Sequence, residues 1–310
     1  MLGGIVVRAS SRSPELKNVK SPVINGKRWV AHLIGRLFPR AASFLEFPAS
    51  RPRYGWERPP YEPFRRACEE KRLAFEERLT RFLEFTQKLL LIPKRSEDPI
   101  NPGWENEMFP ALDAIALYGM LCLERPRRYF EIGAGHSTRF ARRAINDHGL
   151  QTSITCIDPA PGLPVEGVAN RIISSSLEDV DLGLFDELDA GDILFVDGSH
   201  RALMNSDVTV VFLDILPMLK PGVLVHFHDI HLPYDYPPEW THRYYNEQYL
   251  LAAYLLGGKR LDIVLANAFI TRDERLYRIL EPIWTAPAMS HAGRYGASLW
   301  TVTLKDAIHV

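Results

Sequence analysis

Several features that identify a function quickly are missing from this sequence. It has three cysteines, Cys68, Cys122 and Cys156, whose spacing suits neither a metal site nor a disulfide framework. Its formal net charge is −1, which excludes the large positive charge typical of proteins that bind nucleic acids. No apolar run approaches the roughly 18 residues of a membrane span. We therefore expect a cytoplasmic protein with no transmembrane segment and no nucleic-acid partner.

The chain is long enough, at 310 residues and 46% hydrophobic composition, for one large domain with an appendage. Residues 1–63 are predicted to be a basic, proline-rich arm and linker, because the first 50 residues hold eight Lys or Arg against two acids and prolines crowd residues 39–63. A helical extension is predicted over residues 64–106, with one helix from about 64 to 91. The main domain is predicted to cover residues 107–310.

From residue 128 onward, strand patterns and helix patterns alternate along the chain. The helix expected over about 109–123 leads into the first strand, which makes Asp113 and Tyr118 candidates to line a pocket. This alternation predicts a doubly wound α/β domain with a mostly parallel sheet. The predicted strands cover residues 128–132, 154–157, 171–174, 193–196, 223–227, 261–266 and 298–303, and the helices between them cover about 137–148, 205–219 and 246–256.

The most informative stretch is the turn that follows the first strand. Two glycines stand one residue apart, and the segment that follows has helical spacing, so the backbone can approach a ligand closely. The third glycine of a dinucleotide fingerprint is missing, because Thr138 stands there. The acidic residue before the turn repels phosphate and suits a cation such as the sulfonium of S-adenosylmethionine (SAM). The candidate cofactor-binding residues of this turn are Glu131, Gly133, Ala134, Gly135, Ser137 and Thr138.

Other candidate residues follow later strands, since ligands of open parallel sheets bind at the carboxyl ends of the strands. Asp158 lies 25 residues after Gly133, where a carboxylate can accept the hydroxyl protons of a ribose. A turn-forming Asp before a proline is the alternative for this residue. Ser176 and Leu177, after the third strand, are predicted to flank the adenine.

Two clusters are candidates for chemistry. Asp197 and His200 lie three residues apart on a glycine-containing loop, and His200 is the candidate general base. Asp197 and Asp229 follow adjacent predicted strands, so their carboxylates can converge on Mg²⁺, with His228 beside them. An iron site built from His226, His228 and Asp229 is an alternative, and so is a packing role for the two histidines.

Together these motifs resemble the class I SAM-dependent methyltransferases. The segments Glu-Ile-Gly-Ala-Gly-His-Ser-Thr, Val-Asp-Gly-Ser-His, Leu-Lys-Pro-Gly and His-Asp-Ile-His-Leu-Pro resemble the branch that contains cephalosporin-hydroxylase-like proteins and macrolide-sugar O-methyltransferases. The resemblance implies a Rossmann-like sheet of seven strands whose last strand is antiparallel. It also implies that Asp197 and Asp229 bind Mg²⁺ and that His200 is the base, although His228 departs from the usual carboxylate or amide.

The sequence thus predicts a methyltransferase that acts on an oxygen atom of a small molecule, with a sugar or glycoside hydroxyl as one option. His200, Asp197 and Asp229 are the predicted catalytic residues. Two alternatives remain open: a metal-dependent oxygenase on the same scaffold, and a SAM-binding protein without catalysis. The expected partners are the small-molecule acceptor and, as an open option, a second copy of the chain.

Overall fold

The computed structural model describes residues 51–305 of the chain. The chain divides into two units between Ser50 and Arg51. The basic arm predicted within residues 1–50 therefore lies outside the described residues. The predicted boundaries at residues 63 and 106 both fall inside the second unit.

A seven-stranded sheet forms the centre of this unit, with the strand order β3-β2-β1-β4-β5-β7-β6. β7 runs antiparallel to both of its neighbours, β5 and β6, and the other pairs are parallel. This order confirms the predicted doubly wound, Rossmann-like sheet with one antiparallel strand. The strands are β1 (Arg128–Ile132), β2 (Ser153–Ile157), β3 (Arg171–Ile173), β4 (Ile193–Val196), β5 (Leu224–His228), β6 (Leu261–Ala266) and β7 (Ser298–Thr303).

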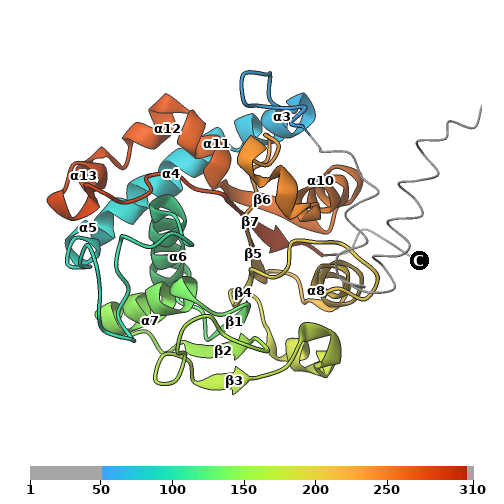
Figure 1. Cartoon of the computed structure of the whole chain (residues 1–310), viewed down its shortest axis with the longest axis horizontal. Helices are drawn as coiled ribbons and strands as arrows, with labels where there is room; N and C mark the ends of the chain where they lie inside the picture. Colours follow the sequence, from blue (N-terminus) through green and yellow to red (C-terminus); the bar gives the residue numbers. More distant parts are fainter. Residues whose placement is uncertain (1–50, 306–310) are drawn as a thin grey trace, which may run out of the picture. The chain divides into compact units, whose positions relative to one another are not determined.

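Helices cover both faces of the sheet. Figure 1 shows α4, α6 and α7 on one face, and α8 and α10 on the other. On the first face lie α4 (Arg72–Phe82), α6 (Ala111–Glu124) and α7 (His136–His148), and on the second α8 (Asp207–Val210) and α10 (Glu247–Gly257). Three short helices, α11 (Asn267–Arg272), α12 (Glu274–Arg278) and α13 (Glu281–Trp284), were not predicted. Among residues 51–305, no helix combines the length and the apolar character needed to cross a bilayer.

Two predicted helices are interrupted. The helix expected over 64–91 consists of α3 (Glu62–Glu70), α4, a 3-10 turn and α5 (Thr86–Leu89), because Lys71 leaves the helical conformation. The helix expected over 205–219 contains a π turn over Val211–Ile215 just before Pro217. A proline has no N–H for the helical hydrogen-bond ladder, which accounts for the disturbed turn.

Helix α4 packs its apolar face into the domain core. Its residues Phe75, Leu79 and Phe82 are fully buried. The ring of Phe82 lies against Gly119 of α6, where a Cβ atom would approach the ring to 2.2 Å. A small residue at this position is therefore required for the two helices to meet.

Candidate active site

The two glycines of the turn after β1 are required for different reasons. Gly133 has φ of +82°, and a Cβ atom there would lie 1.9 Å from the carbonyl oxygen of Asp197 at the end of β4. Gly133 therefore allows two neighbouring strand ends to approach each other. A Cβ atom on Gly135 would meet no atom within 4 Å. Gly135 leaves free space at the start of α7, where a ligand can approach the backbone.

Glu131 and Thr138 stabilise the turn from behind. Both side chains are buried, and the hydroxyl of Ser137 donates a hydrogen bond to Glu131. Burial raises the pKa of Glu131 to about 8, although the bond from Ser137 acts in the opposite direction. Thr138 Oγ1 accepts a hydrogen bond from the N–H of Gly135 at 3.0 Å. Thr138, which occupies the position of the third glycine in a dinucleotide fingerprint, thus stabilises the turn through this hydrogen bond.

Asp158 follows β2 and connects it to the glycine turn. Its carboxylate accepts hydrogen bonds from the backbone N–H groups of Ala134 and Ala160, both at 2.8 Å. Asp158 also lines a cavity of about 420 Å³ at the carboxyl ends of the strands, whereas Glu131, Ser176 and Leu177 do not. The structure therefore brings Asp158 to the cavity beside Gly133–Gly135 and leaves Ser176 and Leu177 outside its wall.

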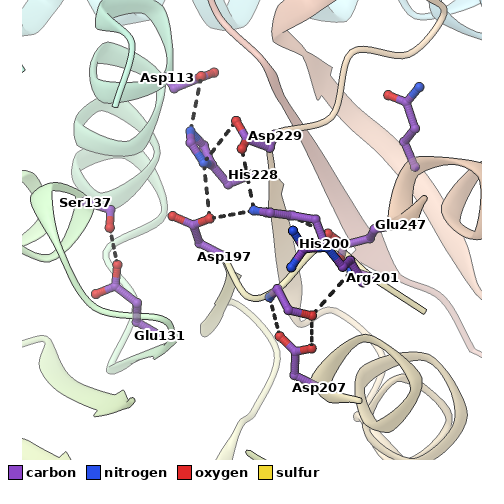
Figure 2. Close-up of polar contacts among 12 residues, drawn as sticks. Asp113, Glu131, Ser137, Asp197, His200, Arg201, Asp207, His228, Asp229 and Glu247 are labelled. Atoms are coloured by element: carbon purple, nitrogen blue, oxygen red, sulfur yellow. Dashed lines mark hydrogen bonds and ion pairs between the residues drawn. The ribbon is translucent and has the colours of Figure 1, made fainter. Parts of the chain in front are cut away.

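His200 follows β4 and lines the same cavity, and three carboxylates surround its ring. Nδ1 of His200 lies 2.8 Å from Glu247 of α10. Its Nε2 atom lies 3.3 Å from Asp197 and 3.6 Å from Asp229 (Figure 2). The side chain is almost fully buried, while Asp197 and Asp229 stay partly exposed to the cavity. Both ring nitrogens of His200 therefore face carboxylates.

A second histidine extends this network to α6. Nδ1 of His228 lies 3.3 Å from Asp197 Oδ1, and its Nε2 lies 3.7 Å from Asp113. Asp113 is fully buried and accepts hydrogen bonds from Asn267, from Ser298 and from the N–H of Ala297. Figure 2 shows the resulting row of alternating acids and imidazoles, Asp113, His228, Asp197, His200 and Glu247, with Asp229 beside both rings.

Electrostatics favour positive charge on both histidines. Burial opposes the charge, but hydrogen bonds with Asp197 and Glu247 raise the pKa of His200 well above its ordinary value. Burial also opposes charge on His228, yet Asp197 and Asp229 raise its pKa to about 9. Burial raises the pKa of the Asp197 carboxyl, but the imidazoles of His228 and His200 outweigh this effect and hold the pKa below its usual range. Asp197 therefore lies between two imidazole rings, and its carboxylate favours positive charge on both.

The backbone at these residues departs from regular strand geometry. His200 and Asp229 have φ values of +58° and +53°, in the left-handed region that non-glycine residues rarely adopt. β5 ends at His228, so the alternation of strand side chains stops there. For this reason the carboxylate of Asp229 turns back towards the imidazole of His228, 3.7 Å away. Such conformations cost free energy and are concentrated at functional sites.

The predicted metal ligands are Asp197, His228 and Asp229. The carboxylate oxygens of both aspartates face imidazole nitrogens of His200 and His228. Within residues 51–305, no group of three or more His, Cys, Asp or Glu side chains is placed to hold a metal. As placed, these side chains do not fit a Mg²⁺ or iron site.

The cavity does fit SAM. Three carboxylates, those of Asp158, Asp197 and Asp229, line it, which favours a ligand with a sulfonium and an ammonium group. His136 also lines it, and among the described residues its Nδ1 atom has no hydrogen-bond partner. The free space over Gly135 admits a ligand against the backbone of the turn. Asp158 would hold the ribose, and the segment 133–136 would face the rest of the donor.

Sequence reasoning missed one member of this site, Glu247, and misplaced another, Asp113. Glu247 lies in the first turn of α10, where an acidic residue is common in any helix, so no local signal marks it. Asp113 was predicted to line a pocket, but it is buried behind His228 and does not reach the cavity wall. The other pocket candidate, Tyr118, instead donates a hydrogen bond to Asp147 of α7.

Residues 130–230 match a family model described as a methyltransferase domain. No curated protein matches the sequence. Solved structures with similarity include the O-methyltransferase TomG of Streptomyces achromogenes, involved in tomaymycin synthesis, in complex with SAM (15% identity, 61% of this chain and 78% of that chain, TM-score 0.38).

Two further structures contain S-adenosylhomocysteine (SAH). They are an O-methyltransferase of Bacillus cereus (13% identity, 74% of this chain and 91% of that chain, TM-score 0.37) and a methyltransferase of Podospora anserina (15% identity, 82% and 100%, TM-score 0.41). The family match, and not these distant structures, identifies the class of enzyme. It shows a methyltransferase domain over residues 130–230, and the strand order is the one predicted for a class I SAM-dependent methyltransferase.

Proposed function

Because residues 130–230 are a methyltransferase domain, we propose that this enzyme transfers the methyl group of SAM to an oxygen atom of a small molecule. A sugar or glycoside hydroxyl is one acceptor of this kind. The observation that carries the proposal is the pairing of His200 with Glu247 at 2.8 Å, with the other ring nitrogen of His200 directed at Asp197 and Asp229 on the cavity side.

When bound, the donor supplies a methyl group on a positively charged sulfur. Glu247 accepts the Nδ1 proton of His200 and fixes the ring, so Nε2 is the atom that can take a proton from the acceptor hydroxyl. The acceptor oxygen forms its bond to the methyl carbon as the carbon–sulfur bond breaks, and its proton goes to Nε2. Asp197 and Asp229 orient the acceptor and His200.

The raised pKa of His200 has a consequence for this step. A base must be neutral before it accepts a proton, and three surrounding carboxylates favour the charged ring. A second positive charge in the same cavity lowers the pKa of His200, because like charges repel. We therefore expect the bound, positively charged donor to make His200 a better base.

The test is methyl transfer from tritiated SAM to a panel of sugars and phenols by wild type and His200→Ala. The substitution is expected to lower turnover by at least roughly 100-fold and to leave the Kd of SAH unchanged. The matched control is His291→Gln, since His291 is exposed and lines no part of the cavity. Unchanged turnover in His200→Ala would remove His200 as the base. Tight SAH binding without product from any acceptor would favour the non-catalytic alternative.

A further inference from the structure

One charged residue of the cavity has no role in the chemistry described so far. Arg243 lies at the end of a 3-10 turn (Pro238–Arg243) in the proline- and aromatic-rich segment after β5, and it lines the same cavity as His200. In the described part of the chain, no carboxylate forms an ion pair with its guanidinium. An unpaired guanidinium in a cavity is a ready donor for an anionic group of a ligand.

Aromatic rings hold this guanidinium in place. Its Cζ atom lies 4.1 Å from the ring centroid of Trp240 and 5.6 Å from that of Tyr245. Tyr245 also lines the cavity, and its ring packs against His200 at 4.6 Å between centroids. Cation–π contacts of this kind fix the position of a guanidinium while its N–H groups stay available.

The backbone around Arg243 is fixed to the loop that carries His200. The N–H groups of Asn246 and Glu247 both donate to the carbonyl oxygen of His200, at 2.9 and 3.2 Å. Nε of Arg201 donates to the carbonyl oxygen of Arg243 at 2.9 Å. The base and the guanidinium are therefore carried by backbone segments that are hydrogen-bonded to each other, and both side chains line one cavity that a single molecule can occupy.

The strand order divides the lining of the cavity into two ends. Asp158 and the glycine turn follow β2 and β1, whereas Asp229 and Arg243 follow β5, which lies beyond β4 in the sheet. The first end suits the donor. The end after β5 contains Arg243 together with His200 and Tyr245, and this is the end where the acceptor must present its hydroxyl to Nε2.

We propose that Arg243 binds a carboxylate or phosphate group of the acceptor, so that the preferred substrates are hydroxylated acids and not neutral alcohols. This inference rests on the proposed methyl transfer and specifies its substrate class. Because the donor also carries a carboxylate, the experiment must separate binding of the acceptor from binding of the donor.

The experiment is calorimetric titration of the full-length enzyme, first with SAH and then, at saturating SAH, with matched probes. The probes are 4-hydroxybenzoate against 4-hydroxybenzyl alcohol, and glucuronate against methyl glucoside. Wild type is expected to bind each acid about 10- to 100-fold more tightly than its neutral partner, as charge-assisted hydrogen bonds allow. Arg243→Gln is expected to remove this preference without changing the Kd of SAH, and Arg243→Lys to keep part of it.

The matched control is Arg272→Gln. The guanidinium of Arg272 is also held by two aromatic rings, Trp56 and Tyr234, at 4.3 and 4.2 Å, but it does not line the cavity. This variant is expected to keep the wild-type preference for acids. Equal binding of acid and alcohol by wild type, no binding of either acid, or an unchanged preference in Arg243→Gln would each overturn the inference.

Two further outcomes separate the possible failures. If Arg243→Gln weakens SAH binding and keeps the preference for acids, the guanidinium binds the donor carboxylate and the inference is wrong. If wild type does not bind SAH at all, the proposed function itself fails. Binding of SAH together with no preference for acids contradicts only the substrate class.

Discussion

Gly133 and Gly135, in the turn after β1, allow a paired prediction. Only one residue separates them, but the space around each is different. In Gly133→Ala, the new methyl group would lie 1.9 Å from the carbonyl oxygen of Asp197. Because contacts below 3.0 Å are not tolerated, the oxygen must move away by about 1.1 Å. The φ of +82° adds about 1–2 kcal/mol of strain for a residue with a Cβ atom. In Gly135→Ala, the methyl group enters free space.

The expected outcomes are therefore opposite. Gly133→Ala should lower the free energy of unfolding by about 2–4 kcal/mol, which corresponds to a decrease in Tm of roughly 5–15 °C for a domain of this size. It should also lower turnover by about 100-fold, because Asp197 moves by about an ångström. Gly135→Ala should keep Tm within roughly 2 °C of wild type and weaken SAH binding about tenfold, since the methyl group occupies the ligand's space.

Thermal unfolding by circular dichroism and calorimetric titration with SAH measure the two quantities separately. Each variant is the control for the other. A wild-type Tm in Gly133→Ala would refute the close approach of the β1 turn to the end of β4. Wild-type SAH affinity in Gly135→Ala would refute the placement of the donor against the turn.

Three further predictions concern the imidazole network. Glu247→Gln should lower kcat by about 10- to 100-fold without a change in SAH affinity, because the carboxylate at Nδ1 of His200 is lost; an unchanged kcat contradicts the pairing. The folded-state pKa of His228 is raised to about 9 from 6.5, so its stabilising contribution is full below about pH 6.5 and lost as pH rises through about 9. The free energy of unfolding, measured with urea between about pH 6.5 and 9, should fall as pH rises in wild type and fall less in His228→Gln. An equal fall in both proteins would count against a charged His228. EDTA should leave methyl transfer unchanged, because the carboxylates face imidazoles; activity restored only by Mg²⁺ would contradict this.

Much of the fold is predictable because its signals are local. Strands β1, β4, β6 and β7 occupy the residues that the apolar runs and their flanking turn residues predict. β5 ends one residue later than expected, at His228, and for that reason His228 belongs to the sheet. The long helix expected from about residue 64 is interrupted at Lys71, where the hydrophobic spacing carries no signal of a break.

The sequence by itself determined the glycine turn and the acids and histidines at the strand ends, because each of these is a short contiguous pattern. The order of these motifs along the chain indicated the methyltransferase class. Only the tertiary structure decided which groups face each other. It placed Glu247 of α10 and Asp113 of α6 at opposite ends of the imidazole network, and it placed Arg243 in the cavity. It also placed Glu131 behind the turn and not in the cavity. These contacts depend on strand order and helix packing, and separations of tens of residues leave no periodic signal of them in the chain.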